Sequence, residues 1–129
     1  MSNPNQAALA AFAAAWREQD LDALVALLTD DVEYRASVGP EPGTTYRGRA
    51  AVRAGFAAMF AYDQAVAVRG SPATFVADRA YVEWEYDVIG PGSKPVAVRG
   101  IDVFGFVNGR IALKDAFRKT YPSDPRSLA

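Results

Sequence analysis

The chain has 129 residues, with 14 Lys and Arg against 15 Asp and Glu, and it contains neither Cys nor His. This length is typical of one compact domain with a sizeable core. A net charge of -1 gives no electrostatic reason to expect nucleic acid or an anionic membrane surface as a partner. The missing Cys and His exclude thiolate zinc sites, histidine metal sites and Ser-His-Asp triads, so acid–base chemistry falls on Asp, Glu, Lys or Tyr.

The start of the chain has no basic segment, and its Ala-rich stretch at 7–16 is too short to cross a bilayer or to resemble a signal peptide. We therefore expect a cytoplasmic protein without membrane contact. No loop carries carboxylates at a spacing suited to Mg²⁺ or Ca²⁺, so we expect neither a metal nor an organic cofactor.

Helical periodicity dominates the first half of the chain. Apolar residues recur at the spacing of one helix face over 7–18. Asp20 is a candidate cap for a second helix, whose apolar stripe extends to Leu28. A short strand at 32–37, a loop at 39–43 and a third helix at 49–61 are expected to follow.

After residue 62 the apolar period changes from 3.6 to 2, which predicts strands. We expect them at 66–69, 72–76, 80–89, 96–107 and 110–120, with a loop at 91–95 and a frayed tail at 121–129. Helices followed by an antiparallel sheet indicate an α+β fold. A single domain would span 1–129, with its core at about 7–120.

Asn108 and Gly109 form the strongest hairpin signal, because both central positions of a type I′ turn need positive φ. A two-residue turn pairs Val107 with Arg110, and continuing that register places Asp102 opposite Asp115. Directly opposite residues share a face, with Cβ atoms roughly 5 Å apart.

The alternation of apolar and charged residues along 82–88 assigns the two faces of the sheet. If its apolar residues share a face with Phe104, the preceding hairpin places Trp84 opposite Asp102 and Arg99 opposite Asp87. The predicted outer face then carries Glu83, Glu85, Asp87, Arg99, Lys114 and Arg118. The predicted inner face carries Val82, Trp84, Tyr86, Val98, Asp102, Phe104, Phe106, Ile111, Leu113, Asp115 and Phe117.

The two inward carboxylates are the main candidates for chemistry. Two like charges among aromatic side chains are costly to ionise together, so we expect Asp102 and Asp115 to share a proton. Alternatively they lie hydrated at the sheet end, or are tied to Arg47, Arg53 or a loop amide. A one-residue slip in the turn would remove the pairing.

Aromatic residues are candidates for the wall of a pocket. Tyr34 should face it, either as a hydrogen-bond donor or as a core residue with its hydroxyl at the rim. Helix residues Phe12, Trp16, Phe56 and Phe60 are either core or pocket wall. Lys119 is expected to point inward near the open end.

Five segments of the chain resemble the SnoaL-like and ketosteroid isomerase-like families of the nuclear transport factor-like superfamily. They are DLDALVALLTDDV at 20–32, VGPEP at 38–42, YRGRAAVR at 46–53, and RGIDVF at 99–104 with NGRI at 108–111. The resemblance covers about 7–120. It implies a strongly curved, mixed but mostly antiparallel sheet wrapped around about three N-terminal helices. It also implies a conical apolar pocket and a homodimer through the outer sheet face.

The resemblance carries over unevenly to single residues. Asp102 matches the aspartic acid that donates a hydrogen bond to the oxyanion in ketosteroid isomerases. The base of those enzymes falls at Ala36 and their oxyanion tyrosine at Phe12, so steroid isomerisation is not expected. Asp115 lies near the acid–base carboxylate of SnoaL-like polyketide cyclases.

We therefore expect a cofactor-independent isomerase, cyclase or related lyase or hydrolase acting on an apolar small molecule. Asp102 and Asp115 would be its catalytic residues. The alternative is a non-catalytic module for hydrophobic-ligand binding or dimerisation. The expected substrate-binding residues are Phe12, Trp16, Tyr34, Phe56, Phe60, Trp84, Tyr86, Phe104 and Phe117.

Overall fold

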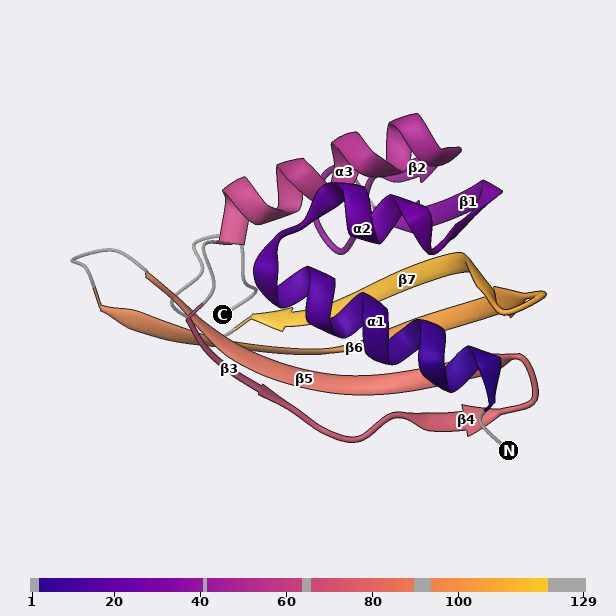
Figure 1. Ribbon diagram of the computed structural model, residues 1–129. Helices are drawn as coiled ribbons and strands as arrows, with labels where there is room; N and C mark the ends of the chain where they lie inside the picture. The colour runs from indigo at the N-terminus through magenta and orange to yellow at the C-terminus, as the bar shows by residue number, and fades with distance from the viewer. Residues whose placement is uncertain (1–2, 41, 64–65, 90–93, 121–129) are drawn as a thin grey trace.

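The computed structural model describes residues 3–40, 42–63, 66–89 and 94–120 (Figure 1). Its helices are α1 (Pro4–Glu18), α2 (Leu21–Ala26) and α3 (Arg49–Asp63). Its strands are β1 (Leu28–Arg35), β2 (Thr45–Arg47), β3 (Val66–Gly70), β4 (Thr74–Val76), β5 (Arg79–Ile89), β6 (Pro95–Val107) and β7 (Arg110–Thr120). The tail predicted at 121–129 and most of the loop predicted at 91–95 lie outside the described residues.

The first two helices begin at side-chain caps. The Asn5 amide donates to the Asn3 side chain at 2.8 Å, and the Ala23 amide donates to Asp20 Oδ1 at 3.1 Å. The predicted cap at Asp20 is therefore confirmed. The helix after it ends earlier than predicted, because Leu28 pairs with Ile111 as the start of β1.

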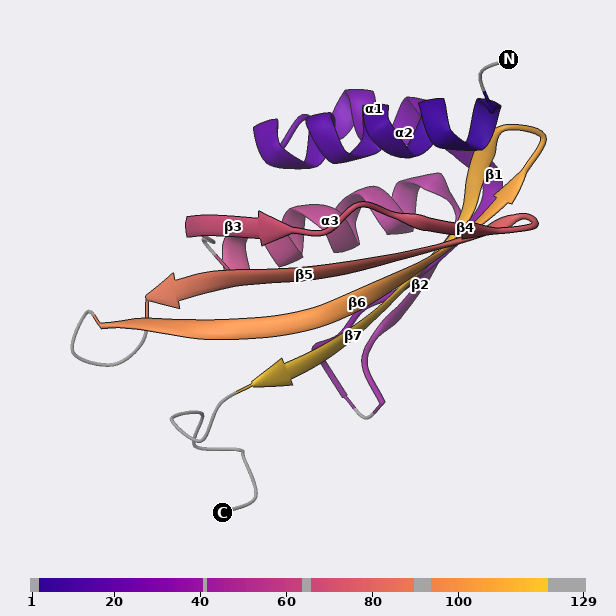
Figure 2. The same ribbon diagram turned by 90° about the horizontal axis from the view of Figure 1, so that it is seen from below.

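The strands form one curved seven-stranded sheet in the order β2-β1-β7-β6-β5-β3, with β4 also paired to β5. The β1–β7 pair is parallel and the other pairs are antiparallel. All three helices lie on one side of this sheet (Figures 1 and 2). The α+β architecture inferred from the sequence is confirmed, and β2, only three residues long, was missed.

The core lies between the helices and the inner face of the sheet. Its largest fully buried side chains are Leu24, Leu28, Val32, Tyr34, Val52, Phe56 and Ile111. Leu24, Val52 and Phe56 lie on apolar stripes of the helices, as the sequence indicated, and the other four lie on β1 and β7. No helix within the described residues is long and apolar enough to cross a membrane.

The β6–β7 hairpin turns where predicted and then departs from the predicted register. Asn108 and Gly109 have φ of 51° and 74°, as a type I′ turn requires. Phe106 pairs with Ile111, but Gly105 pairs with Leu113, so Ala112 is an extra residue on β7. This β-bulge shifts the rest of β7 by one residue relative to β6.

The shift exchanges the two faces of β7 and overturns the predicted carboxylate pair. Asp102 lies opposite Ala116, whereas Asp115 lies opposite Val103 on the outer face and pairs with Arg35 at 3.1 Å. Neither arginine suggested as a tether holds these carboxylates: Arg47 pairs with Glu33 and Arg53 with Asp22.

Five further side chains of β7 change sides for the same reason. Leu113, predicted inward, lies opposite Gly105 on the outer face. Phe117, predicted inward, is 53% exposed on the outer face. Lys119, also predicted inward, is exposed opposite Arg99. Lys114 and Arg118, predicted outward, face the helices and line a cavity.

The β5–β6 hairpin keeps the predicted faces with a shift of two residues. Val82 lies opposite Asp102 and Trp84 opposite Gly100. Arg99 therefore faces Glu85 instead of Asp87. A shift by two preserves the face of every side chain, because the strand repeat is two residues.

Candidate functional site

A cavity of about 760 Å³ lies between the helices and the inner face of the sheet. Most of its wall is apolar. Of the residues predicted to bind substrate or act on it, Phe12, Trp16, Tyr34, Phe60, Trp84, Tyr86, Asp102 and Phe104 line it. Phe56 is instead completely buried behind the wall and packs against Phe12, Trp16 and Tyr34. Asp115 and Phe117 do not line it, because the bulge turns both outward.

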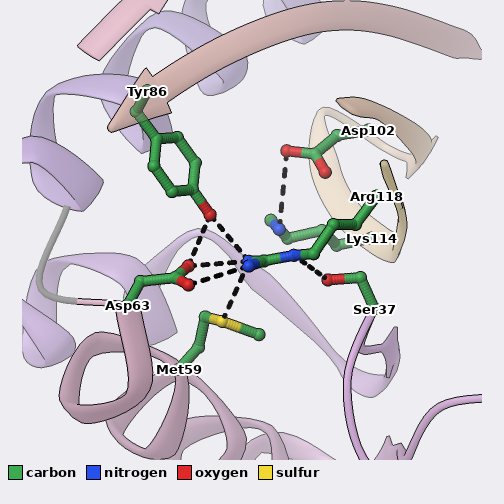
Figure 3. Close-up of polar contacts among 7 residues, drawn as sticks. All are labelled: Ser37, Met59, Asp63, Tyr86, Asp102, Lys114 and Arg118. Atoms are coloured by element: carbon green, nitrogen blue, oxygen red, sulfur yellow. Dashed lines mark hydrogen bonds and ion pairs between the residues drawn. The ribbon is translucent and has the colours of Figure 1, made fainter. Parts of the chain in front are cut away.

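Lys114 and Asp102 place a charge pair inside this apolar cavity (Figure 3). Lys114 Nζ lies 3.5 Å from Asp102 Oδ2, and the two side chains are 6% and 15% exposed. The other carboxylate oxygen, Oδ1, is buried and has no hydrogen-bond partner among the described residues. The carboxylate is therefore held through one oxygen, while the other is buried without a partner among the described residues.

Two aromatic rings surround the ammonium group of Lys114. Its Nζ lies 4.5 Å from the ring centroid of Trp16 and 4.9 Å from that of Tyr34. Ring faces attract a cation, and together with Asp102 they offset part of the cost of removing it from water.

Burial, followed by the nearby charge of Asp102, raises the pKa of Tyr34. Its hydroxyl is therefore neutral at physiological pH.

A second polar cluster lies in the same cavity wall and links three elements. Arg118 on β7 donates to both carboxylate oxygens of Asp63 at 2.9 and 2.8 Å, and to the hydroxyl of Ser37 at 3.2 Å. Tyr86 accepts a hydrogen bond from Arg118 at 2.7 Å and donates to Asp63 (Figure 3). Arg118 and Asp63 are only 7% and 10% exposed, so this bidentate pair is buried.

The neutral state of Tyr86 follows from this cluster. Burial and the hydrogen bond to Asp63 raise the pKa of Tyr86, and they outweigh the opposing charge of Arg118. Its phenol therefore keeps its proton. The hydrogen bonds of the cluster also hold the end of α3 against β5 and β7. Sequence reasoning missed Asp63, Lys114 and Arg118 as cavity residues.

The described residues bring no three His, Cys, Asp or Glu side chains together in a group able to hold a metal ion. The polar groups that line the cavity include two carboxylates, an ammonium, two guanidinium groups and two phenols. They also include the Trp84 indole, whose buried Nε1 has no partner among the described residues. Such groups suit proton transfer and the binding of carbonyl or hydroxyl oxygens.

The fold is shared with several solved structures. An NTF2-like protein of unknown function from Mesorhizobium loti has 21% identity over 90% of this chain and 91% of that chain, with a TM-score of 0.75. TerC, co-crystallized with polyporic acid, has 19% identity over 91% and 92%, with a TM-score of 0.75. A putative polyketide cyclase from Sinorhizobium meliloti has 23% identity over 84% and 92%, with a TM-score of 0.68.

No curated protein matches the chain. The model of the SnoaL-like domain, however, matches residues 9–114. Since this match covers most of the chain, the protein belongs to the SnoaL-like domain family.

Proposed function

We propose that the protein binds an apolar carbonyl compound in the cavity and moves a proton at the carbon beside the carbonyl, as an isomerase or cyclase does. The observation that carries this proposal is the free oxygen of Asp102. Its Oδ1 is buried in an apolar cavity without a partner among the described residues, while Oδ2 lies beside Lys114. A carboxylate placed beside a bound ligand in such a cavity is positioned to act as a general base.

In this proposal Asp102 accepts the proton and Lys114 stabilises the negative charge that develops on the carbonyl oxygen. Each of these contributions supplies about 10²-fold or more in enzymes. Lys114 replaces the second carboxylate expected from the sequence, because Asp115 lies on the outer face.

Two solved structures of the same fold support the substrate class. One is a putative polyketide cyclase and another was co-crystallized with polyporic acid. The aromatic lining of the cavity, with Trp84 stacked on Tyr86 at 5.0 Å between ring centroids, fits a flat ring compound.

Exchange of the hydrogens beside the carbonyl of 2-tetralone in D₂O, followed by NMR, tests the proposal. The wild-type protein should accelerate exchange over buffer. Asp102→Asn should lower that rate by about 10²-fold or more while 2-tetralone still raises the melting temperature.

Asp115→Asn is the matched control, because this carboxylate lies on the same strand pair but outside the cavity. It should leave exchange unchanged. Equal losses in both variants would overturn the proposal. Binding of 2-tetralone without any exchange would favour the non-catalytic ligand-binding module instead.

A further inference from the structure

We propose that the amine of Lys114 forms a protonated imine with an aldehyde or ketone bound in the cavity. The inference rests on the proposed function for the cavity and for the carbonyl class of ligand. It adds a covalent step in which Lys114 is a catalytic residue.

The surroundings of Lys114 Nζ exclude most water, and no carboxylate among the described residues lies within normal hydrogen-bond distance of it. Its side chain is 6% exposed, and the nearest carboxylate oxygen is 3.5 Å away, beyond a normal hydrogen bond. Its other described neighbours are the ring faces of Trp16 and Tyr34. Amine nucleophiles in enzymes lie in pockets of this kind, where the nitrogen is shielded from water and close to a group that can take its proton.

Asp102 is placed to take the proton that the ammonium must lose. Oδ2 lies on the Nζ side of the carboxylate, so transfer along this ion pair gives a neutral amine and a carboxylic acid. The amine can then attack a carbonyl carbon that lies in the cavity beside it. The proton on Asp102 can next protonate the hydroxyl that leaves.

Atoms and charge balance in this sequence. The nitrogen lone pair forms the new C–N bond while the carbonyl π bond breaks, and a second proton moves from nitrogen to the former carbonyl oxygen. That oxygen leaves as water. The net change is ammonium plus ketone to protonated imine plus water, without an oxidant or reductant.

The covalent step would assist the proton transfer already assigned to Asp102. A protonated imine withdraws electrons more strongly than a ketone, so the hydrogen on the adjacent carbon becomes more acidic. After the leaving hydroxyl has been protonated, Asp102 is again a carboxylate and can accept that hydrogen. The neighbouring amine and base therefore serve one reaction from adjacent strands, β7 and β6.

The sequence supplies its own controls, because it contains three lysines, Lys94, Lys114 and Lys119. Lys94 and Lys119 are exposed, whereas Lys114 lines the cavity. A reagent that reduces imines therefore reports on one cavity amine and two solvent amines in the same molecule.

The experiment incubates the full chain with 2-tetralone and sodium cyanoborohydride, then measures the adduct at each lysine by peptide mass spectrometry. Lys114 should be alkylated about tenfold faster or more than Lys94 and Lys119. Alkylation at Lys114 no faster than at the two exposed lysines, from pH 6 to pH 10, would overturn the inference.

Three variants sharpen the result. Lys114→Met should lose the fast adduct and keep slow labelling of the exposed lysines, while Lys119→Arg should keep the fast adduct. Asp102→Asn should slow the labelling of Lys114, because the acid that protonates the leaving hydroxyl is gone.

The exchange assay separates this inference from the proposed function. Exchange that depends on Asp102 without an adduct at Lys114 overturns the imine and leaves the proposed function standing. A fast Lys114 adduct without exchange supports the imine and contradicts the proposed proton transfer.

Discussion

Lys114 Nζ lies 3.5 Å from Asp102 Oδ2 inside an apolar cavity, although the two residues are not directly opposite in the β6–β7 ladder. Asp102 is paired with Ala116, and Lys114 with Phe104 two residues further along. Such diagonal neighbours on one face are within reach of a long side chain. The ion pair therefore depends on the bulge at Ala112, which turns Lys114 inward.

Removal of one charge of this pair should cost more stability than removal of both. Asp102→Asn leaves the ammonium of Lys114 buried without its counter-charge, which we expect to cost about 3 kcal/mol. Adding Lys114→Met should recover part of that loss, because an apolar side chain then fills the site. Urea unfolding of both single variants and the double variant measures the coupling. A double variant less stable than Asp102→Asn would contradict this expectation.

The buried pair of Arg118 and Asp63 should matter far more than an exposed pair of similar length. Asp63→Asn leaves a guanidinium buried beside Tyr86, with an expected cost of about 3–5 kcal/mol. Asp22→Asn is the matched control, because Asp22 pairs with Arg53 at 2.6 Å while its side chain is 87% exposed. That change should cost less than about 1 kcal/mol. Similar midpoints of urea unfolding for the two variants would contradict the expectation that the buried pair contributes more stability than the exposed pair.

The sequence predicted those parts of the fold that depend on local patterns. The cap at Asp20, the type I′ turn at Asn108 and Gly109, and the inner faces of β5 and β6 all follow from residue type and period. The eight predicted residues that line the cavity come from α1, β1, α3, β5 and β6, outside the part of β7 that the bulge shifts.

The bulge could not be predicted from the sequence, because β7 places apolar residues on the inner face both with and without the extra residue. Ile111 and Leu113 fit one register, whereas Ala116 fits the other, and Phe117 is apolar although it faces outward. Only packing decides between them: Ile111 is fully buried in either register, whereas the bulge brings Lys114 under Trp16. One extra residue therefore replaced a predicted carboxylate pair with an ammonium–carboxylate pair.

The stability of the protein should fall above pH 10 because of its buried phenols. Burial raises the pKa of Tyr34 above the ordinary 10.0, so its folded form keeps a proton that the unfolded chain releases. The unfolded state then binds fewer protons, and the free energy of unfolding falls by about 1.4 kcal/mol per pH unit for each such group. Below pH 10 both states are protonated and this contribution is fully present.

Urea unfolding of the wild type and Tyr34→Phe between pH 9 and pH 11.5 checks this expectation. The variant should show a shallower decline, since Tyr86, whose pKa is also raised, still contributes. Parallel declines for the two proteins would show that Tyr34 titrates alike in both states, contrary to the expectation.

Gly100 should be intolerant of a side chain because Trp84 occupies the space that a Cβ would need. An added Cβ would overlap the indole ring of Trp84 and the backbone oxygen of Phe117. Gly100→Ala should therefore displace Trp84 from its stack on Tyr86 and cost about 1–3 kcal/mol. Near-ultraviolet circular dichroism, which reports on the stacked rings, and urea unfolding measure the two effects.

Gly70→Ala is the matched control, because Gly70, the last residue of β3, is also paired with Trp84. An added Cβ at Gly70 meets nothing within 4 Å. Neither glycine has a positive φ, so backbone strain does not separate the two substitutions. The Gly70 variant should keep the aromatic signal and remain within about 0.5 kcal/mol of the wild type. If Gly100→Ala changed neither the aromatic signal nor the free energy of unfolding, the indole would have room to move. The cavity wall at Trp84 would then be less rigid than its packing indicates.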